Sequence, residues 1–345
     1  MSVGVNPAPQ RVPIQHYDSC DMKPNLFVIG AMKSGTSSLH DYLQFHPQIL
    51  MSTPKETGFF DDNPGHQCPE IRHPDGHGRP SLERYLKLFS GAESKTYAGE
   101  SSTYYTKWPH VSGVAPRLYQ FNPDARLVYI VRDPVERAIS EYWFSRKRGW
   151  ESGPPDQLRR ASKYWNLSNY PMQVRQYLKY FSQNQLYVMT LEELQRAPAA
   201  TMGALFTWLG LELPPGHADE RYTDRKNTTD AAVQRDGAVV NKLRKVPAFG
   251  YAKRVLPVKV REAARHMING RIDPNSVDMT ENIEFLREMF TPFALELEEL
   301  CGRQFREWRT LWGPGAAIPE RPETVPTASP EPHRLPSEAA PLPAR

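Results

Sequence analysis

A loop bounded by two glycines offers the groups that hold an anion. Gly30 and Gly35 stand at the ends of the loop, and Lys33 places an ammonium group between them. The hydroxyl donors beside the lysine are Ser34, Thr36 and Ser37. The next segment has the apolar spacing of a helix, and the first N–H groups of a helix have no partner within it. Since the helix dipole is also positive there, the loop predicts a site for a phosphate-like group.

The elements on either side of this loop must hold it in place. Leu26–Ile29 is a continuous apolar run, typical of a buried central strand, and the helix after the loop should end at His46, before a proline. A turn glycine and a helix cap would explain the glycine and hydroxyl residues without a ligand, but the strand and the lysine favour an anion site. The common nucleotide-binding loop has Gly-Lys-Ser/Thr, whereas here Lys33 comes two residues before Gly35.

A second group of polar residues follows another apolar run, Arg126–Val131. Arg132 comes directly after the run, a proline suits the first turn of the next helix, and Ser140 lies about two turns further on. A guanidinium fork and a hydroxyl can grip one phosphate together. The alternative is a structural ion pair of Arg132 with Asp133 or Glu136 and a serine that faces solvent. That alternative would be favoured for either residue alone, but two anion sites that both follow buried strands favour binding.

Together these motifs resemble those of the sulfotransferases that use 3′-phosphoadenosine 5′-phosphosulfate (PAPS). The resemblance implies that residues Lys33–Ser37 hold the 5′-phosphosulfate, that Lys33 stabilises the departing phosphate, and that Arg132 and Ser140 hold the 3′-phosphate. It also implies a P-loop-like sulfotransferase fold, release of the product PAP and no metal ion. Arg225 and Lys226 lie in a polar stretch where family members often fold a loop over the nucleotide, so they are weaker candidates for the cofactor site.

The stretch from Pro54 to Asp61 resembles a segment of the heparan-sulfate-type carbohydrate sulfotransferases in which a glutamate is the catalytic base. The resemblance assigns that role to Glu56, with Lys55 on the acceptor side. An exposed lysine–glutamate pair on a loop is the alternative. Many of those enzymes have a histidine two residues after the glutamate, whereas this chain has Gly58.

The segment from Gly99 to Tyr105 resembles the next family segment and predicts further acceptor contacts. These are expected from Ser101, Ser102 and Tyr105, although Ser101 replaces a lysine that is often found there. Aromatic residues that sugar rings could stack on gather nearby, but at these spacings a role in the core is favoured for them. They are Tyr104, Tyr105, Trp108, Tyr142, Trp143, Phe144, Tyr164 and Trp165.

Short apolar runs alternate with helical patterns along the chain, which predicts an α/β fold with a central parallel sheet and helices on both faces. The expected strands are Leu26–Ile29, Thr96–Ala98, Arg126–Val131 and Gln185–Thr190. The expected helices, besides the one after the loop, are Leu82–Phe89, Val135–Arg148, Met172–Phe181, Ala199–Leu209 and Glu281–Leu300. Ligands of such sheets bind at the carboxyl ends of the strands, where the glycine-bounded loop falls.

Composition limits what else the chain could be. We expect a loose segment over residues 1–24, a single sulfotransferase domain over 25–312 and a disordered, proline-rich tail over 313–345. Three widely spaced cysteines, the absence of a signal-peptide pattern and the lack of a long apolar stretch favour a cytoplasmic location without a membrane span. The net charge of +4 is too small to argue for nucleic acid, and a weak homo-oligomer remains compatible with the sequence.

The sequence therefore predicts transfer of a sulfuryl group from PAPS to a hydroxyl or amine, with a carbohydrate as the favoured acceptor. A small-molecule alcohol or phenol is the alternative within the class. A P-loop kinase and a non-catalytic nucleotide-binding or scaffold protein are the more remote alternatives. The kinase is disfavoured because the Gly-Lys-Ser/Thr motif is missing.

Overall fold

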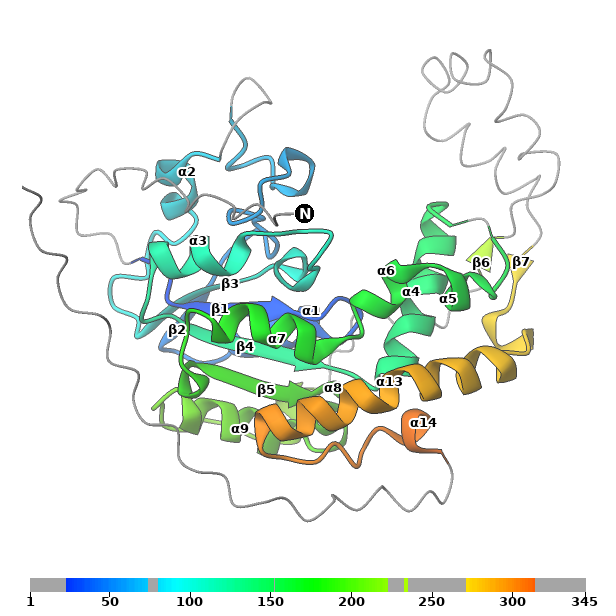
Figure 1. Ribbon diagram of the computed structural model, residues 1–345. Coiled ribbons are helices and arrows are strands. Elements are labelled where there is room, and N and C mark those ends of the chain that lie inside the picture. Colours follow the sequence, from blue (N-terminus) through cyan, green and yellow to red (C-terminus); the bar gives the residue numbers. More distant parts are fainter. Residues whose placement is uncertain (1–22, 74–79, 152, 223–232, 235–270, 314–345) are drawn as a thin grey trace, which may run out of the picture.

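The computed structural model describes residues 23–73, 80–151, 153–222, 233–234 and 271–313 (Figure 1). The expected loose segment before residue 23 and the expected tail after residue 313 lie outside these residues.

A five-stranded parallel sheet forms the centre of the molecule (Figure 1). Its strands are β1 (Leu26–Gly30), β2 (Ile49–Met51), β3 (Tyr97–Ser101), β4 (Arg126–Val131) and β5 (Leu186–Thr190). Their order across the sheet is β2-β3-β1-β4-β5, so the strand before the glycine-bounded loop is the middle one. A tight turn cannot join two neighbouring parallel strands. Each connection therefore crosses over the sheet and contains helical segments. The expected parallel sheet is confirmed.

Helices cover both faces of this sheet. They are α1 (Thr36–Leu43), α2 (Leu82–Lys87), α3 (Val114–Phe121), α4 (Pro134–Arg148), α5 (Gln157–Arg160), α6 (Ser162–Asn166), α7 (Tyr170–Leu178), α8 (Leu191–Arg196), α9 (Pro198–Trp208), α13 (Thr280–Cys301) and α14 (Arg309–Trp312). A two-stranded antiparallel sheet pairs β6 (Val233–Gln234) with β7 (Arg271–Ile272).

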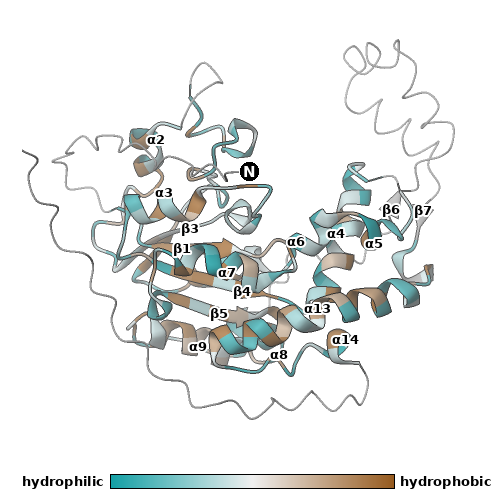
Figure 2. Cartoon of the chain, viewed as in Figure 1, coloured by the Kyte–Doolittle hydropathy of each residue, from teal (hydrophilic) through white to brown (hydrophobic). Residues whose placement is uncertain are grey.

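Alternate residues of the central strands pack into two separate hydrophobic cores, one on each face of the sheet. Phe27 and Ile29 of β1 pack in one core with side chains of α2, α3, α4, α7 and α13. Leu26 and Val28 pack in the other with side chains of α1, α8 and α9. Because successive residues of a strand point to opposite faces, a strand buried on both faces must be apolar throughout. Figure 2 shows hydrophobic colours along the central strands and more hydrophilic colours on outer helical turns.

The C-terminal helices brace the start of α4. Leu286, Phe290 and Leu297 of α13 stand at helical spacing and are fully buried. The chain then returns to the sheet, where the backbone N–H of Leu311 donates to the Asp133 carboxylate at 2.9 Å. The other oxygen of Asp133 caps α4 by accepting from the backbone N–H of Val135 at 3.0 Å. Arg132 directly precedes this capped turn. The two contacts of Asp133 therefore also fix the position of Arg132.

Candidate active site

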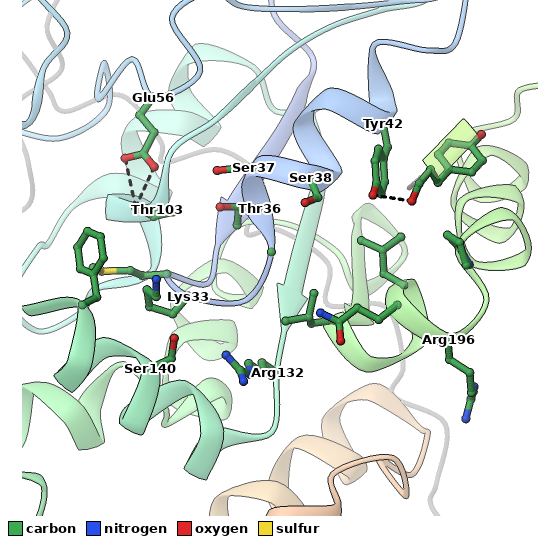
Figure 3. A pocket seen from close by; sticks show the side chains of 18 of the residues that line it. Lys33, Thr36, Ser37, Ser38, Tyr42, Glu56, Thr103, Arg132, Ser140 and Arg196 are labelled. Atoms are coloured by element: carbon green, nitrogen blue, oxygen red, sulfur yellow. Dashed lines mark hydrogen bonds between the residues drawn. The ribbon is translucent and has the colours of Figure 1, made fainter. Parts of the chain in front are cut away.

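A pocket of about 900 Å³ opens at the carboxyl ends of the central strands. The loops that follow β1, β4 and β5 form its wall, together with residues from the segments after β2 and β3. In the view of Figure 3, Glu56, Lys33 and Ser140 lie toward one end, Tyr42 and Arg196 toward the other, and Arg132 between them. The place is the one expected for a ligand of an open α/β sheet.

The glycine-bounded loop has the shape of an anion cradle. Gly35 has a φ of 87° and stands just before α1, and a Cβ there would come within 2.6 Å of the Leu191 side chain. Glycine is therefore favoured on conformational grounds, whereas the crowding comes only from the end of a flexible side chain. Thr36 and Ser37 open α1 and line the pocket with Gly35 and Lys33. The structure thus brings four of the five expected loop residues to the pocket.

Lys33 is the cation that the loop itself contributes to the pocket. Its Nζ lies 4.5 Å from the centre of the Phe144 ring, and within the described part of the chain it forms no ion pair. Burial, together with the positive charge of Arg132, lowers the pKa of Lys33 to about 8. The Lys33 ammonium is thus partly removed from water and lies near a second positive charge. Both conditions favour the binding of a negatively charged ligand.

Ser34 is the exception in the loop. It is fully buried, its Oγ has no hydrogen-bond partner among the described residues, and its backbone N–H donates to the Ala31 carbonyl at 3.2 Å. The Ser34 side chain thus lies inside the protein and does not line the pocket, and its expected contact with the cofactor stays a prediction.

Arg132 and Ser140 line the same pocket as the loop. The Arg132 guanidinium pairs with Glu136 at 3.1 Å, one helical turn away, and keeps part of its surface exposed. The ion pair that sequence reasoning weighed against phosphate binding is thus formed, yet it leaves donors of the planar guanidinium fork for a ligand. Arg225 and Lys226, the weaker cofactor candidates, lie outside the described residues.

Glu56 lies on the pocket wall beside these cations. Thr103 Oγ1 lies 3.3 and 3.2 Å from the two carboxylate oxygens of Glu56, and Lys55 Nζ lies 3.0 Å from Oε1. The Glu56 side chain is 36% exposed, so its carboxylate is both oriented and accessible. These two properties are what a general base requires. Lys55 itself is not among the pocket-lining residues, although its ammonium lies between two of them, Glu56 and Thr36.

The structure places the three residues of the Gly99–Tyr105 segment that were expected to contact the acceptor inside the protein. Ser101, Ser102 and Tyr105 are buried and do not line the pocket. Ser102 and Tyr105 donate to the buried Glu100 carboxylate at 2.9 and 3.0 Å, and Ser101 Oγ lies 2.8 Å from His40 Nδ1. Thr57 and Tyr85 also donate to Glu100, so four hydroxyls surround one carboxylate. Burial raises the pKa of Glu100, and the hydroxyl donors oppose that shift. The motif builds an internal network instead of a binding surface.

The replacement at Gly58 has a steric cause. Gly58 has a φ of 67°, and a Cβ there would stand 2.4 Å from the carbonyl oxygen of His66. No side chain fits, so the histidine that many carbohydrate sulfotransferases carry here cannot be accommodated without moving the backbone. His66 stacks on Tyr104, with 3.8 Å between ring centres, and its Nδ1 lies 2.5 Å from the Asp61 carboxylate.

Sequence reasoning missed several pocket residues. Lys107 lies with its Nζ 3.9 Å from the centre of the Tyr104 ring, and Trp150 is 66% exposed at the pocket edge against Phe144. Neither belongs to a motif, and Lys107 follows the Gly99–Tyr105 segment by only two positions. Of the aromatic residues singled out from the sequence, Tyr104 and Phe144 line the pocket. Tyr105, Tyr142, Trp143 and Tyr164 are core residues.

Comparison with known proteins identifies the family. The model of the sulfotransferase family matches residues 24–215, which is more than half of the chain. The chain therefore belongs to the sulfotransferase family, whose members are transferases, and the expected family and enzyme class are confirmed.

Curated relatives extend this result. The chain is 35% identical over 122 residues to the membrane-associated sulfotransferase kil1 of Dictyostelium discoideum, a match covering 35% of this chain and 23% of that protein. It is 27% identical over 218 residues to the mouse bifunctional heparan sulfate N-deacetylase/N-sulfotransferase 4, covering 56% and 23%. It is also 27% identical over 202 residues to mouse heparan sulfate glucosamine 3-O-sulfotransferase 6, covering 55% and 53%. The matched segment thus spans between a quarter and about half of these relatives.

A solved structure confirms the fold. A sulfotransferase from Alicyclobacillus acidocaldarius superposes with a TM-score of 0.55 at 24% identity, and the match covers 83% of this chain and 99% of that one. The P-loop-like sulfotransferase fold expected from the sequence is therefore correct.

No helix in the part of the chain that the structure describes is long and apolar enough to cross a membrane. No group of three or more His, Cys, Asp or Glu side chains is placed there to hold a metal ion. The cytoplasmic location expected from the sequence stays a prediction.

Proposed function

We propose that this protein transfers a sulfuryl group from PAPS to a hydroxyl or amine of an acceptor. The observation that carries the proposal is that Lys33, Arg132 and Glu56, which come from three different loops, line one pocket. Two cations and one accessible carboxylate are the minimum that transfer from an anionic donor requires.

The residues present fit such a donor. Lys33, Gly35, Thr36 and Ser37 would hold the 5′-phosphosulfate, with N–H groups at the start of α1 as further donors. Arg132 and Ser140 would hold the 3′-phosphate. PAPS supplies an activated sulfur whose leaving group is a phosphate. The Lys33 ammonium, which forms no ion pair among the described residues, and the exposed part of the Arg132 guanidinium both favour a ligand with negative charges at two ends.

Glu56 would act as the general base. Its carboxylate takes the proton of the acceptor hydroxyl or amine as the acceptor atom bonds to sulfur. The bond from sulfur to the 5′-phosphate oxygen breaks, and its electron pair stays on that oxygen as PAP is released. Lys33 stabilises the charge that develops there. Thr103 and Lys55 hold the two carboxylate oxygens so that no reorientation is needed during the step.

A carbohydrate is the acceptor we propose. The heparan sulfate enzymes among the relatives act on a carbohydrate according to their names. In addition, the exposed Trp150 and the Tyr104 and Phe144 rings give the pocket flat apolar surfaces on which a sugar can stack. A small alcohol or phenol would use the same surfaces and remains the second candidate.

Calorimetric titration with PAP tests the donor assignment before any acceptor is known. We expect PAP to bind much more tightly than AMP or ATP, because Arg132 and Ser140 recognise the 3′-phosphate. Arg132→Ala should weaken PAP binding about 10- to 100-fold, the value of one or two charged hydrogen bonds, and leave AMP binding unchanged. Equal affinity for PAP and AMP would remove the proposal. ATP turnover that depends on magnesium would favour the kinase alternative.

A further inference from the structure

Lys55 occupies an unusual position between the donor loop and the base. Its Nζ lies 3.0 Å from Glu56 Oε1 and 3.2 Å from Thr36 Oγ1. Thr36 is the first residue of α1, at the end of the anion cradle, whereas Glu56 lies in the segment after β2. One ammonium therefore joins the two halves of the site, although Lys55 and Thr36 are 19 residues apart in the chain.

The ammonium has capacity for a third partner. A lysine ammonium carries three N–H donors, and Thr36 and Glu56 account for two of them. The Lys55 side chain is 20% exposed, so the group is shielded without being sealed. A charge-assisted hydrogen bond in such a setting is worth more than one at a fully exposed position.

Other residues hold Glu56 and the loop independently of Lys55. Thr103 Oγ1 lies within hydrogen-bond distance of both carboxylate oxygens, and Gly35 fixes the turn before Thr36. Lys55 is therefore not the sole support of either half of the site. Lys55 contributes a positive charge between Glu56, the proposed base, and the loop that is proposed to hold the donor.

We infer that Lys55 binds the sulfuryl end of the donor and thereby aligns it with the base, instead of contacting the acceptor as expected from the sequence. This inference rests on the proposed function. The third N–H of Lys55 donates to a sulfuryl oxygen, while the other two keep Glu56 and Thr36 in register with it. Lys55 is thus a donor-binding and positioning residue that distinguishes PAPS from PAP, because PAP has no sulfuryl group.

Calorimetry with PAPS and with PAP, both without acceptor, tests this assignment. Lys55→Met should weaken PAPS binding about 10-fold, which corresponds to about 1.4 kcal/mol, and should change PAP binding less than about 2-fold. Lys55→Arg keeps the charge and should recover most of the PAPS affinity. Lys87→Met is the matched control, since Lys87 also pairs with a glutamate, at 2.7 Å, but on the exposed surface of α2.

The outcomes separate the inference from the function on which it rests. Equal losses of PAPS and PAP affinity in Lys55→Met would overturn the inference and make Lys55 a structural support of the loop. No loss for either ligand would overturn it as well. Retained PAP binding shows in the same experiment that the variant is folded. If the wild-type protein binds neither ligand, the proposed function itself fails.

Discussion

Gly58 offers a stringent test of how the segment that carries Glu56 is built. Replacing it with alanine adds one methyl group at a φ of 67°, at 2.4 Å from the His66 carbonyl oxygen and 2.9 Å from its carbon. Two costs combine. A left-handed backbone conformation costs a residue with a Cβ about 1–2 kcal/mol, and forcing backbone atoms apart adds about 1–3 kcal/mol. The expected loss in the free energy of unfolding is therefore about 2–5 kcal/mol.

Gly210 provides the control because it shares the conformation without the crowding. Its φ is 71°, and a Cβ there would meet nothing within 4 Å. Gly210→Ala should therefore cost only the conformational part, about 1–2 kcal/mol. Urea unfolding of both variants, with the midpoint compared at an unchanged slope, measures the difference. Equal destabilisation would refute the steric explanation of Gly58 and reopen the position to a histidine.

Three further predictions concern the site itself. Glu56→Gln should abolish sulfuryl transfer and leave PAP binding intact, so turnover with labelled PAPS and calorimetry should diverge; an active variant would exclude Glu56 as the base. PAP affinity should fall as the pH rises through about 8, because Lys33 is protonated below its pKa and attracts the anion only in that form, and Lys33→Arg should flatten the profile. Ser102→Ala should lower the free energy of unfolding by about 1–3 kcal/mol, since it removes one donor from a buried carboxylate. It should leave the acceptor KM unchanged, and an altered KM without loss of stability would restore Ser102 to the acceptor site.

The positions of the residues in the proposed donor half of the site were predictable from the sequence because they depend on local structure. An apolar run, a glycine and a helix start together define where Lys33, Thr36 and Ser37 lie. The same holds for Arg132 and Ser140, which follow the observed strand Arg126–Val131. The helix expected over Glu281–Leu300 also forms, extended by one residue at each end, since its apolar spacing is regular.

The errors fall where polar residues are buried. The strand expected over Thr96–Ala98 runs instead from Tyr97 to Ser101. The last residues of this strand include Glu100. A glutamate is rarely fully buried, so the sequence alone predicts that this position is exposed. Four hydroxyls satisfy this carboxylate, and two of them, on Thr57 and Tyr85, come from 43 and 15 residues away, beyond the reach of a local sequence pattern. The strand Ile49–Met51 was missed for a simpler reason, because three residues are too few to show a periodicity.

The two halves of the pocket therefore differ in how far a family motif can be carried over. The donor half is made of strand ends and a helix start, whose geometry follows from the backbone. The acceptor half is made of side chains on irregular segments, and their directions depend on long-range contacts such as that of Gly58 with His66. Ser101, which stands where family members often have a lysine, is buried in the core. On this side of the pocket a positive charge comes from Lys107, whose ammonium lies over the Tyr104 ring. We therefore expect acceptor specificity to depend on the side chains that do line the pocket on this side, which are Tyr104, Lys107, Phe144 and Trp150.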